Sequence, residues 1–439
     1  MLASTTLAAQ PTGLDRFVGE WSGPLVTPSL RGTVTHRLSR SANALVIQTT
    51  VSARGTTLHG RASRIQLRAD TLTFHVELGG SSIEWTGSLR ENGLVGTVRV
   101  RQQMDVVADG VWEATRPASN IPAVVGAAAL LDAAWTMIDR GYANFGDRAI
   151  DWDTVRRVFA SRLTASASDS VTFSVITEML GLLNDEHVGL RSDTRRFTAG
   201  RRAETPEDSA RHAIIARRYV RTPFAAHAQG TIRAGWLADS VAYMHLAEFA
   251  APRLVGPALD SILEQVVHAR GLVIDLRDNR GGSDVSGQRL LRRIADQRRL
   301  YMSSRARALR AHDSFLPPQE WFMQPSDEQG FNGPVIVLTN RRTVSAAENF
   351  LLGARELPHV SIVGDVTAGA FSDVTRETLP NGWVLSFPLN AITDARGRSW
   401  EGVGIAPDYR RTNTPAERAS SRDTPLELAL DLLANRPRP

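Results

Sequence analysis

The sequence predicts a multidomain α+β protein with an antiparallel β-domain first, a helical bundle second and an α/β core last. Three observations support this order. Residues 14–116 alternate apolar and polar side chains with a period of two, the residues from 123 repeat at helical spacing, and strand-like and helix-like segments alternate from residue 233 onward. A chain of 439 residues is long enough for two or three such domains.

The β-domain is predicted from short strands separated by glycine. In the stretch TLTFHVEL, Leu72, Phe74, Val76 and Leu78 fall on one face and polar residues on the other, which is typical of a half-buried strand. Several such strands, with tryptophans spread among them, indicate a small antiparallel sheet or barrel. The domain resembles, faintly, the lipocalin-like β-domains appended to secreted hydrolases.

Residues 1–13 are rich in small side chains and resemble the tail of a signal peptide, but they lack a basic region and a full apolar region. Two interpretations stay open, a signal remnant and a disordered tail. A periplasmic or secreted location is therefore expected, with a cytoplasmic one as the alternative. No apolar run approaches the ~20 residues of a membrane-spanning helix, so no membrane span is expected.

The later part of the chain changes from helical repeats to alternating strands and helices. Leu131, Trp135 and Ile138 follow helical spacing, and GLVIDLR and PVIVLT are continuous apolar runs of the kind found in strands buried on both faces. The expected boundaries are a helical region at 123–191, an irregular arginine-rich connection at 192–232, an α/β catalytic core at 233–412, and a linker with a final helix at 413–439.

Composition excludes several kinds of chemistry. The chain has no Cys, which removes disulfides, thiolate metal sites and cysteine nucleophiles. All 51 Lys and Arg residues are Arg, so no lysine amine can activate a nucleophile. The net charge of +5 is small for this length, and no basic helix is interleaved with aromatic residues. The sequence therefore gives no reason to expect nucleic-acid binding.

Ser345 opens a predicted helix directly after an apolar strand, in the stretch TVSAAENF. Ser345 and Glu348 match the capping box, in which serine accepts from the amide of the third helical residue and glutamate reaches back. A serine at a strand-to-helix turn also lies where free amides and the helix dipole can stabilise an oxyanion. Helix cap and nucleophile are both compatible with this position.

Three other places can supply what a serine nucleophile requires, and each has an ordinary alternative. Gly281 and Gly282 follow a buried strand, where glycine serves a turn or directs an amide at a reacting carbonyl. His187 lies where a helix ends, and Glu401 lies in a loop rich in glycine; either can be a plain structural residue. A weak hydroxyl needs a base, the base needs a carboxylate, and the oxyanion needs donors. The chain offers one candidate for each.

The motifs GLVIDLRDNRGG, VLTNRRTVSAAENF and VGIAPD, in this order, resemble the carboxyl-terminal processing peptidase family, the clan of tail-specific and tricorn core proteases. The resemblance covers roughly residues 124–411 and not the β-domain. It implies a crotonase-like α/β core of the type found in tail-specific proteases, a polypeptide substrate, and catalysis without a metal or organic cofactor. The Ser–Lys members of the family are excluded because Lys is absent.

The Ser–His–Glu branch remains. By resemblance, Ser345 is the nucleophile, His187 the general base and Glu401 the residue that orients it. The Ala346 amide and an amide of Gly281 or Gly282 would form the oxyanion hole.

Two departures from the family pattern bear on substrate capture. Tricorn-type members place a second serine beside the histidine, but the neighbours of His187 are Glu186 and Val188. Segment 192–232 is also too short to hold the peptide-binding PDZ domain of many members. A non-catalytic protein that binds an apolar ligand on the same scaffold, and an esterase with the same triad, are the alternatives. The sequence leaves the oligomeric state open.

Overall fold

The computed structural model describes most of the chain. The described residues are 14–26, 31–41, 44–53, 56–90, 93–102, 105–116, 126–148, 150–200, 211–221, 224–237, 240–307, 315–326 and 330–435. Residues 1–13, the expected tail or signal remnant, lie outside these ranges, as do residues 117–125 between the β-domain and the helical region. The chain forms two compact units. The first holds the β-domain with two short pieces, Asp139–Gly141 and Ala306–Gln319, and the second holds the rest.

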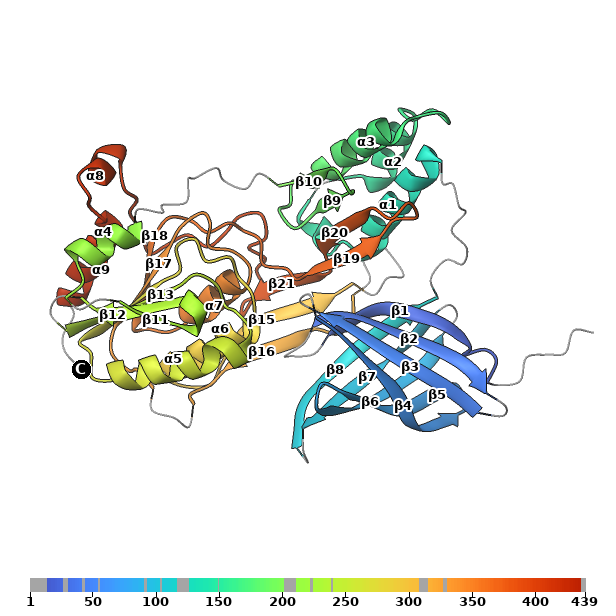
Figure 1. Ribbon diagram of the computed structural model, residues 1–439, viewed down its shortest axis with the longest axis horizontal. Coiled ribbons are helices and arrows are strands. Elements are labelled where there is room, and N and C mark those ends of the chain that lie inside the picture. Colours follow the sequence, from blue (N-terminus) through green and yellow to red (C-terminus); the bar gives the residue numbers. More distant parts are fainter. Residues whose placement is uncertain are drawn as a thin grey trace, which may run out of the picture. The chain divides into compact units, whose positions relative to one another are not determined.

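The β-domain is a closed antiparallel barrel, drawn in blue to cyan in Figure 1. Each strand pairs with the next in the chain, and the first pairs with the last, Ser22 with Thr115 and Val26 with Val111. The predicted sheet or barrel is thus a barrel. Its strands are β1 (Gly19–Val26), β2 (Arg31–Ser41), β3 (Ala44–Ala53), β4 (Thr56–Arg68), β5 (Thr71–Leu78), β6 (Ser81–Arg90), β7 (Gly93–Gln102) and β8 (Asp105–Thr115).

Aromatic side chains fill the barrel interior. Leu72, Phe74, Val76 and Leu78 are all buried, as the alternation in β5 predicts. The buried His36 ring lies edge-on to Phe74, Trp85 and Trp112, with ring centroids 4.8–5.2 Å away. Burial lowers the pKa of His36 to about 3, because a charged imidazole would lose its hydration among these rings. His36 is therefore a neutral core residue.

The second unit is built on a seven-stranded sheet in the order β11-β12-β13-β14-β17-β18-β22. Strands β13 to β22 in this order run parallel, and β11 and β12 are antiparallel at one edge. The two apolar runs of the sequence form β14 and β17 at its centre, with every residue buried. The strands are β11 (Ala225–His227), β12 (Ile232–Trp236), β13 (Val241–Leu246), β14 (Gly271–Asp275), β17 (Val335–Thr339), β18 (Val360–Gly364) and β22 (Tyr409–Arg410).

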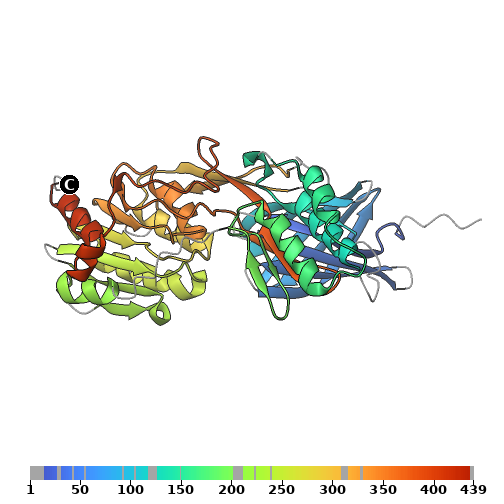
Figure 2. The same cartoon turned by 90° about the horizontal axis from the view of Figure 1, so that it is seen from above.

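Helices cover both faces of this sheet (Figures 1 and 2). One core cluster joins the sheet to α5 (Pro252–Val266), α6 (Asp284–Ile294) and α7 (Ala346–Ala354), and another joins its opposite face to α4 (Arg211–Arg218) and α9 (Thr424–Ala434). The loops that follow β14 and β17 both leave from the carboxyl ends of neighbouring parallel strands. Ligands bind at this edge in open α/β sheets.

The second unit also contains two smaller sheets. A four-stranded sheet has the order β10-β9-β20-β19, and a three-stranded sheet has the order β16-β15-β21. The remaining elements are α1 (Ala127–Gly141), η1 (Phe145–Asp147), α2 (Trp152–Ala160), α3 (Asp169–Gly181), β9 (Gly189–Arg191), β10 (Arg196–Thr198), η2 (Ala228–Gly230), β15 (Arg299–Ala306), β16 (Gln319–Met323), β19 (Val374–Thr378), β20 (Val384–Pro388), β21 (Asn390–Asp394) and α8 (Pro415–Ala419).

The expectation of an irregular connection at 192–232 was wrong in part. This segment contains β10, α4, β11 and the start of β12. The strands are only 3 residues long, and α4 carries just two buried residues, Arg211 and Ile215. Apolar periodicity needs a longer repeat to be visible, so the sequence pattern could not indicate these elements.

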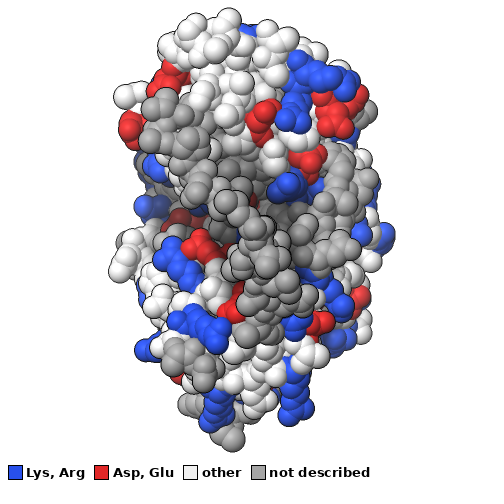
Figure 3. Space-filling view, turned by 90° about the vertical axis from the view of Figure 1, so that its right-hand side faces the viewer, with Lys and Arg blue, Asp and Glu red and all other residues white. Residues whose placement is uncertain are grey.

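The surface carries charges of both signs. Figure 3 shows arginine and acidic side chains interspersed on the face that it draws, rather than gathered by sign. Among the described helices, none is both long and apolar enough to cross a membrane.

Candidate active site

Ser345 occupies a strained turn between β17 and α7. Its backbone angles are φ 60° and ψ −124°, in a region that residues with a side chain rarely adopt. Strain of this kind costs ~1–3 kcal/mol and persists only where the surrounding structure enforces it, most often at functional sites. The side chain is partly exposed, although its neighbours Val344 and Ala346 are buried. The turn therefore presents one hydroxyl at the surface of a rigid core.

The capping-box arrangement of Ser345 and Glu348 is present, and the Glu348 amide also has a main-chain acceptor. The Glu348 amide makes its short hydrogen bond, of 2.7 Å, to the Ser345 carbonyl oxygen. Glu348 in turn accepts from the Ser345 amide at 3.2 Å. The start of α7 is thus also held by the main chain and by the glutamate, so it does not depend on the serine side chain alone.

Glu348 also ties a loop to the start of α7. The carboxylate is fully buried and accepts from the Thr367 hydroxyl and from the amides of Gly369 and Ala370, at 2.7 and 2.9 Å. The Ala370 carbonyl accepts from the Ser345 amide at 2.9 Å. Burial raises the pKa of Glu348 to about 7, against the hydrogen bonds, which favour the ionised form. This buried clamp holds the turn that carries Ser345.

Gly281 lies against Ser345. A Cβ added to Gly281 would come within 2.6 Å of Ser345 Cβ and 2.8 Å of the Val344 carbonyl oxygen, and its φ is +79°. Only glycine allows this approach without strain. The Gly281 amide itself donates to Asn279 Oδ1 at 2.9 Å.

Gly282 and Ala346 each follow one of the two residues in this contact, and their amides are unpaired. Within the described part of the chain, neither amide N–H has a hydrogen-bond partner. Gly282 has φ +123°, and a Cβ there would meet the Phe249 carbonyl oxygen at 2.2 Å. Unpaired amides at such a turn are suited to an oxyanion. Of the two glycines suggested by the sequence, Gly282 has an amide that is free to donate, and Gly281 leaves room for Ser345 because it has no side chain.

His187 lies in the turn between α3 and β9. Its amide donates to Asp185 Oδ1 at 2.8 Å. Its Nδ1 atom is buried and has no hydrogen-bond partner among the described residues. Burial lowers the pKa of His187, while the charges of Asp185 and Asp373 act in the opposite direction. The imidazole is therefore neutral near pH 7 and able to accept a proton.

Glu401 lies beside His187 in the structure, although 214 positions separate them along the chain. Ligand-capable atoms of Asp185, His187 and Glu401 all lie within 4.8 Å of one another. Glu401 Oε2 accepts from the Phe371 amide and from the Ser372 hydroxyl, both at 3.1 Å. Burial, and then the charge of Asp185, raise the pKa of Glu401 well above its usual range.

Asp185 was missed by the sequence reasoning. It is buried, and its Oδ2 accepts from the Tyr142 hydroxyl at 2.8 Å and lies 3.5 Å from Arg148 Nη2. Its position two residues before His187 was the available signal, since an Asp side chain often bonds the amide two residues on. The three side chains could also hold a metal ion, but three donors already occupy the Asp185 oxygens.

Loop 365–372 connects the serine turn with the histidine cluster. The Ser345 amide donates to the Ala370 carbonyl, and the next two residues, Phe371 and Ser372, donate to Glu401. No hydrogen bond joins Ser345 Oγ to His187 in the described part of the chain. Catalytic hydrogen bonds are often long in ligand-free sites and form when the substrate binds. The fold thus brings the predicted residues to one hydrogen-bonded region.

Comparison with known proteins shows which family and which folds this chain is similar to. Residues 240–411 match Peptidase family S41. Tricorn protease homolog 1 of Streptomyces coelicolor is 27% identical over 234 residues, which cover 51% of this chain and 20% of that protein. A second tricorn protease homolog of this organism is 34% identical over 111 residues, which cover 24% of this chain and 10% of that protein. The chain thus spans a fifth or less of the curated relatives it matches.

Two solved structures share the fold. A crystal structure of a candidate peptidase from Parabacteroides merdae is similar with a TM-score of 0.64 and 28% identity, covering 71% of this chain and 97% of that chain. Mature CPAF complexed with lactacystin has a TM-score of 0.55 and 13% identity, covering 71% of this chain and 99% of that chain. At that identity the likeness concerns the fold alone. The multidomain α+β class and the resemblance noted in the sequence are confirmed.

Proposed function

Because residues 240–411 belong to peptidase family S41, we propose that this protein is a serine peptidase that cleaves polypeptides through an acyl-enzyme. The observation that carries the proposal is the turn at Ser345. A partly exposed hydroxyl stands on a strained backbone, the unpaired amide of Ala346 follows it, and the unpaired amide of Gly282 lies next to Gly281, which contacts Ser345. Acyl transfer requires a nucleophilic hydroxyl and hydrogen-bond donors for the oxyanion. Backbone strain of this kind is kept most often at functional sites.

The reaction follows from the roles of these groups. Ser345 Oγ attacks the scissile carbonyl carbon while His187 takes the hydroxyl proton. The carbonyl oxygen gains the negative charge, and the Gly282 and Ala346 amides donate to it. The tetrahedral intermediate then expels the amine, which receives the proton from His187. In the second half, His187 removes a proton from water, the hydroxide attacks the acyl-serine ester, and Ser345 recovers its proton as the acid product leaves.

Two carboxyl groups support His187 in this proposal. The Asp185 carboxylate accepts from the His187 amide and fixes the turn. Glu401 is the candidate for orienting the ring, because it lies in the same cluster and its own position is fixed by Phe371 and Ser372. Burial favours the neutral form of Glu401, and the charge of Asp185 acts in the same direction. The imidazolium that forms when His187 takes the proton would favour the ionised form of Glu401.

Two finer features rest on the sequence alone. A periplasmic or secreted location follows from the resemblance of residues 1–13 to a signal remnant, and cleavage near a substrate's carboxyl terminus follows from the resemblance of the sequence motifs to the tail-specific protease clan. Cell fractionation tests the first. Mapping the cut sites relative to the ends of a substrate tests the second.

The test of the activity is casein digestion followed by mass spectrometry. Wild type should produce fragments, and Ser345→Ala and His187→Ala should produce none. His227→Ala is a matched control because His227 is a partly buried histidine outside the cluster. A fluorophosphonate probe should label Ser345 in wild type. An inactive wild type whose Ser345 also resists the probe would refute the proposal, whereas a labelled serine without casein cleavage would indicate an ester substrate.

A further inference from the structure

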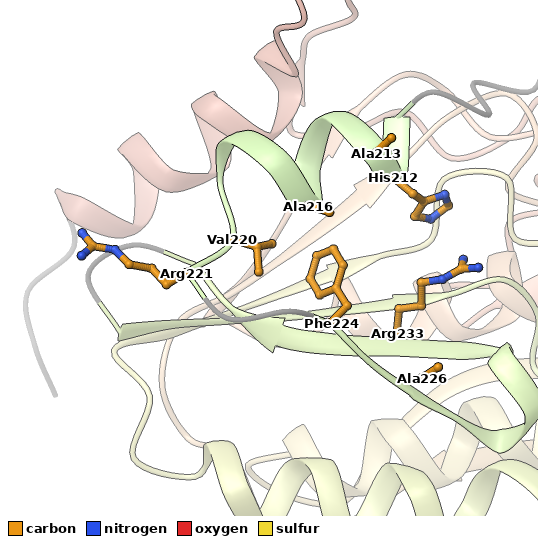
Figure 4. A pocket seen from close by; sticks show the side chains of 8 residues that line it. All are labelled: His212, Ala213, Ala216, Val220, Arg221, Phe224, Ala226 and Arg233. Carbon is orange, nitrogen blue, oxygen red and sulfur yellow. The ribbon is translucent and has the colours of Figure 1, made fainter.

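A pocket lies between α4 and the edge of the main sheet, away from the residues assigned to catalysis. Its volume is about 620 Å³, within the range of ~300–1,000 Å³ common for ligand sites. Figure 4 shows the lining side chains, which come from α4, the turn after it, β11 and β12. They are His212, Ala213, Ala216, Val220, Arg221, Phe224, Ala226 and Arg233.

The two arginines of this pocket are unpaired. Within the described part of the chain, neither Arg221 nor Arg233 has an ion pair or a side-chain hydrogen bond. The neighbouring arginines on α4 are engaged, since Arg211 bonds Asp278 and Arg217 bonds Ser421. Two free guanidinium groups on one pocket attract anions, and carboxylates match their geometry.

The middle of the pocket is apolar and preformed. The Phe224 ring lies over Gly235, where an added Cβ would approach the ring to 2.8 Å. The ring also stacks on Tyr243, with centroids 5.2 Å apart and an interplanar angle of 28°. Tyr243 is fixed by a 2.7 Å hydrogen bond to Asp275. A ligand group that packs here meets a rigid aromatic surface.

The other wall is held at both ends of α4. The Arg211 guanidinium bonds Asp278 at 2.7 Å, and the Tyr219 hydroxyl bonds Glu427 of α9 at 2.6 Å. Fixed walls reduce the ordering cost of binding. The Asp278 contact also ties this wall to the loop that leads to Gly281, three residues further on.

The two arginines mark opposite ends of the pocket. The Arg221 amide donates to the Trp236 carbonyl, and Trp236 follows Arg233 by three residues on β12. At ~3.3 Å per residue the two backbones are ~10 Å apart along the strand. In Figure 4 the two guanidinium groups point away from each other, with Phe224 between them.

We propose that this pocket binds an acidic segment of a polypeptide in extended form, with carboxylates at positions i and i+4 and an apolar side chain at i+2. These three side chains share one face of a strand and span ~13 Å. The carboxylates meet Arg221 and Arg233, and the apolar side chain packs on Phe224. Use of the pocket to recruit substrate outside the cleaved bond rests on the proposed peptidase function; the binding itself does not.

The test is fluorescence anisotropy on Ser345→Ala protein, so that no cleavage interferes. The probe is a labelled peptide with both ends blocked and the core Glu-Ser-Leu-Ser-Glu. Arg221→Gln and Arg233→Gln should each weaken binding about fivefold, the effect of losing one well-exposed ion pair of up to ~1 kcal/mol. Phe224→Ala should weaken it further, and Arg217→Gln, on the same helix but outside the pocket, should stay within about twofold.

Changes in the peptide test whether its carboxylates are recognised. Gln in place of both Glu should remove binding, and 0.5 M salt should weaken that of the acidic peptide. Equal affinity of the Gln peptide, or unchanged affinity of the folded Arg233→Gln variant, would overturn the proposal. So would tighter binding of a peptide whose only carboxylate is its free end. Casein cleavage by wild type without peptide binding would refute only the proposed role of the pocket. Peptide binding without casein cleavage by wild type would refute only the proposed peptidase activity.

Discussion

Replacing Ser345 by glycine should stabilise the second unit, although the serine begins a helix. The serine holds φ 60° and ψ −124°, a conformation that costs a residue with a Cβ ~1–3 kcal/mol and costs glycine little. Glycine adds ~0.4–1 kcal/mol of chain entropy to the unfolded state. The expected net change is therefore a gain of ~0.5–2 kcal/mol. Ser345→Ala keeps its Cβ and the strain, so its stability should stay within ~0.5 kcal/mol of wild type.

The sign of this change separates the strained turn from a simple helix cap. A serine cap predicts that alanine costs ~0.5–2 kcal/mol and that glycine costs a few tenths. The chain has two compact units, so one global unfolding curve does not suffice. Hydrogen exchange of the α7 and β17 amides, followed through a denaturant series, reports the local stability. A Ser345→Gly variant less stable than wild type, with Ser345→Ala lower still, would refute the strain argument.

Three further predictions test the site and the barrel. Burial lowers the pKa of His187, and the charge of Asp185 raises it. Asp185→Asn should therefore lower the pKa of His187 further and move the acid limb of the kcat/KM profile to lower pH. A move to higher pH would contradict this effect of the Asp185 charge. Gly281→Ala should lower kcat/KM at least ~100-fold by displacing Ser345, whereas Gly382→Ala, with φ +88° and no atom within 4 Å of the added Cβ, should keep most of it. The pKa of His36 is about 3 in the folded barrel and ~6.5 in the unfolded chain, so between these values the unfolded chain binds more protons. The free energy of unfolding of the barrel should therefore fall by up to ~1.4 kcal/mol per pH unit as the pH drops through this range. A His36→Phe barrel with the same slope would show that another group is responsible.

The parts of the fold that the sequence predicted are those with long uniform patterns. β14 and β17 are continuous apolar runs that are buried on both faces, and β5 alternates over its full length. No such pattern in the sequence predicted that the barrel closes. Closure depends on β1 meeting β8, near 90 residues later in the chain, and alternation looks the same in an open sheet and in a closed one.

The sequence suggested the residues of the proposed site but not their hydrogen bonds. Chemistry and motif order suggested Ser345, His187 and Glu401, and the structure gathers them around loop 365–372. The division of labour between Gly281 and Gly282 depends on which amide Asn279 occupies. Asp185 has a sequence signal in its position two residues before His187, but its contacts with Tyr142 and Arg148 appear only in the structure. Such local partners are set by packing, which a single sequence does not reveal.

The hydrogen bonds of Glu348 explain how Ser345 can stand at a helix-cap position and still serve as the proposed nucleophile. In an ordinary capping box the serine side chain satisfies the helix amide, so the hydroxyl is used up. Here the Ser345 carbonyl also accepts from that amide, and the buried carboxylate of Glu348 accepts from the amides of Ser345, Gly369 and Ala370. The same pattern therefore caps the start of α7 and fixes the loop that carries Phe371 and Ser372 toward Glu401. A capping motif can thus release its serine for catalysis, provided that another acceptor takes over the cap.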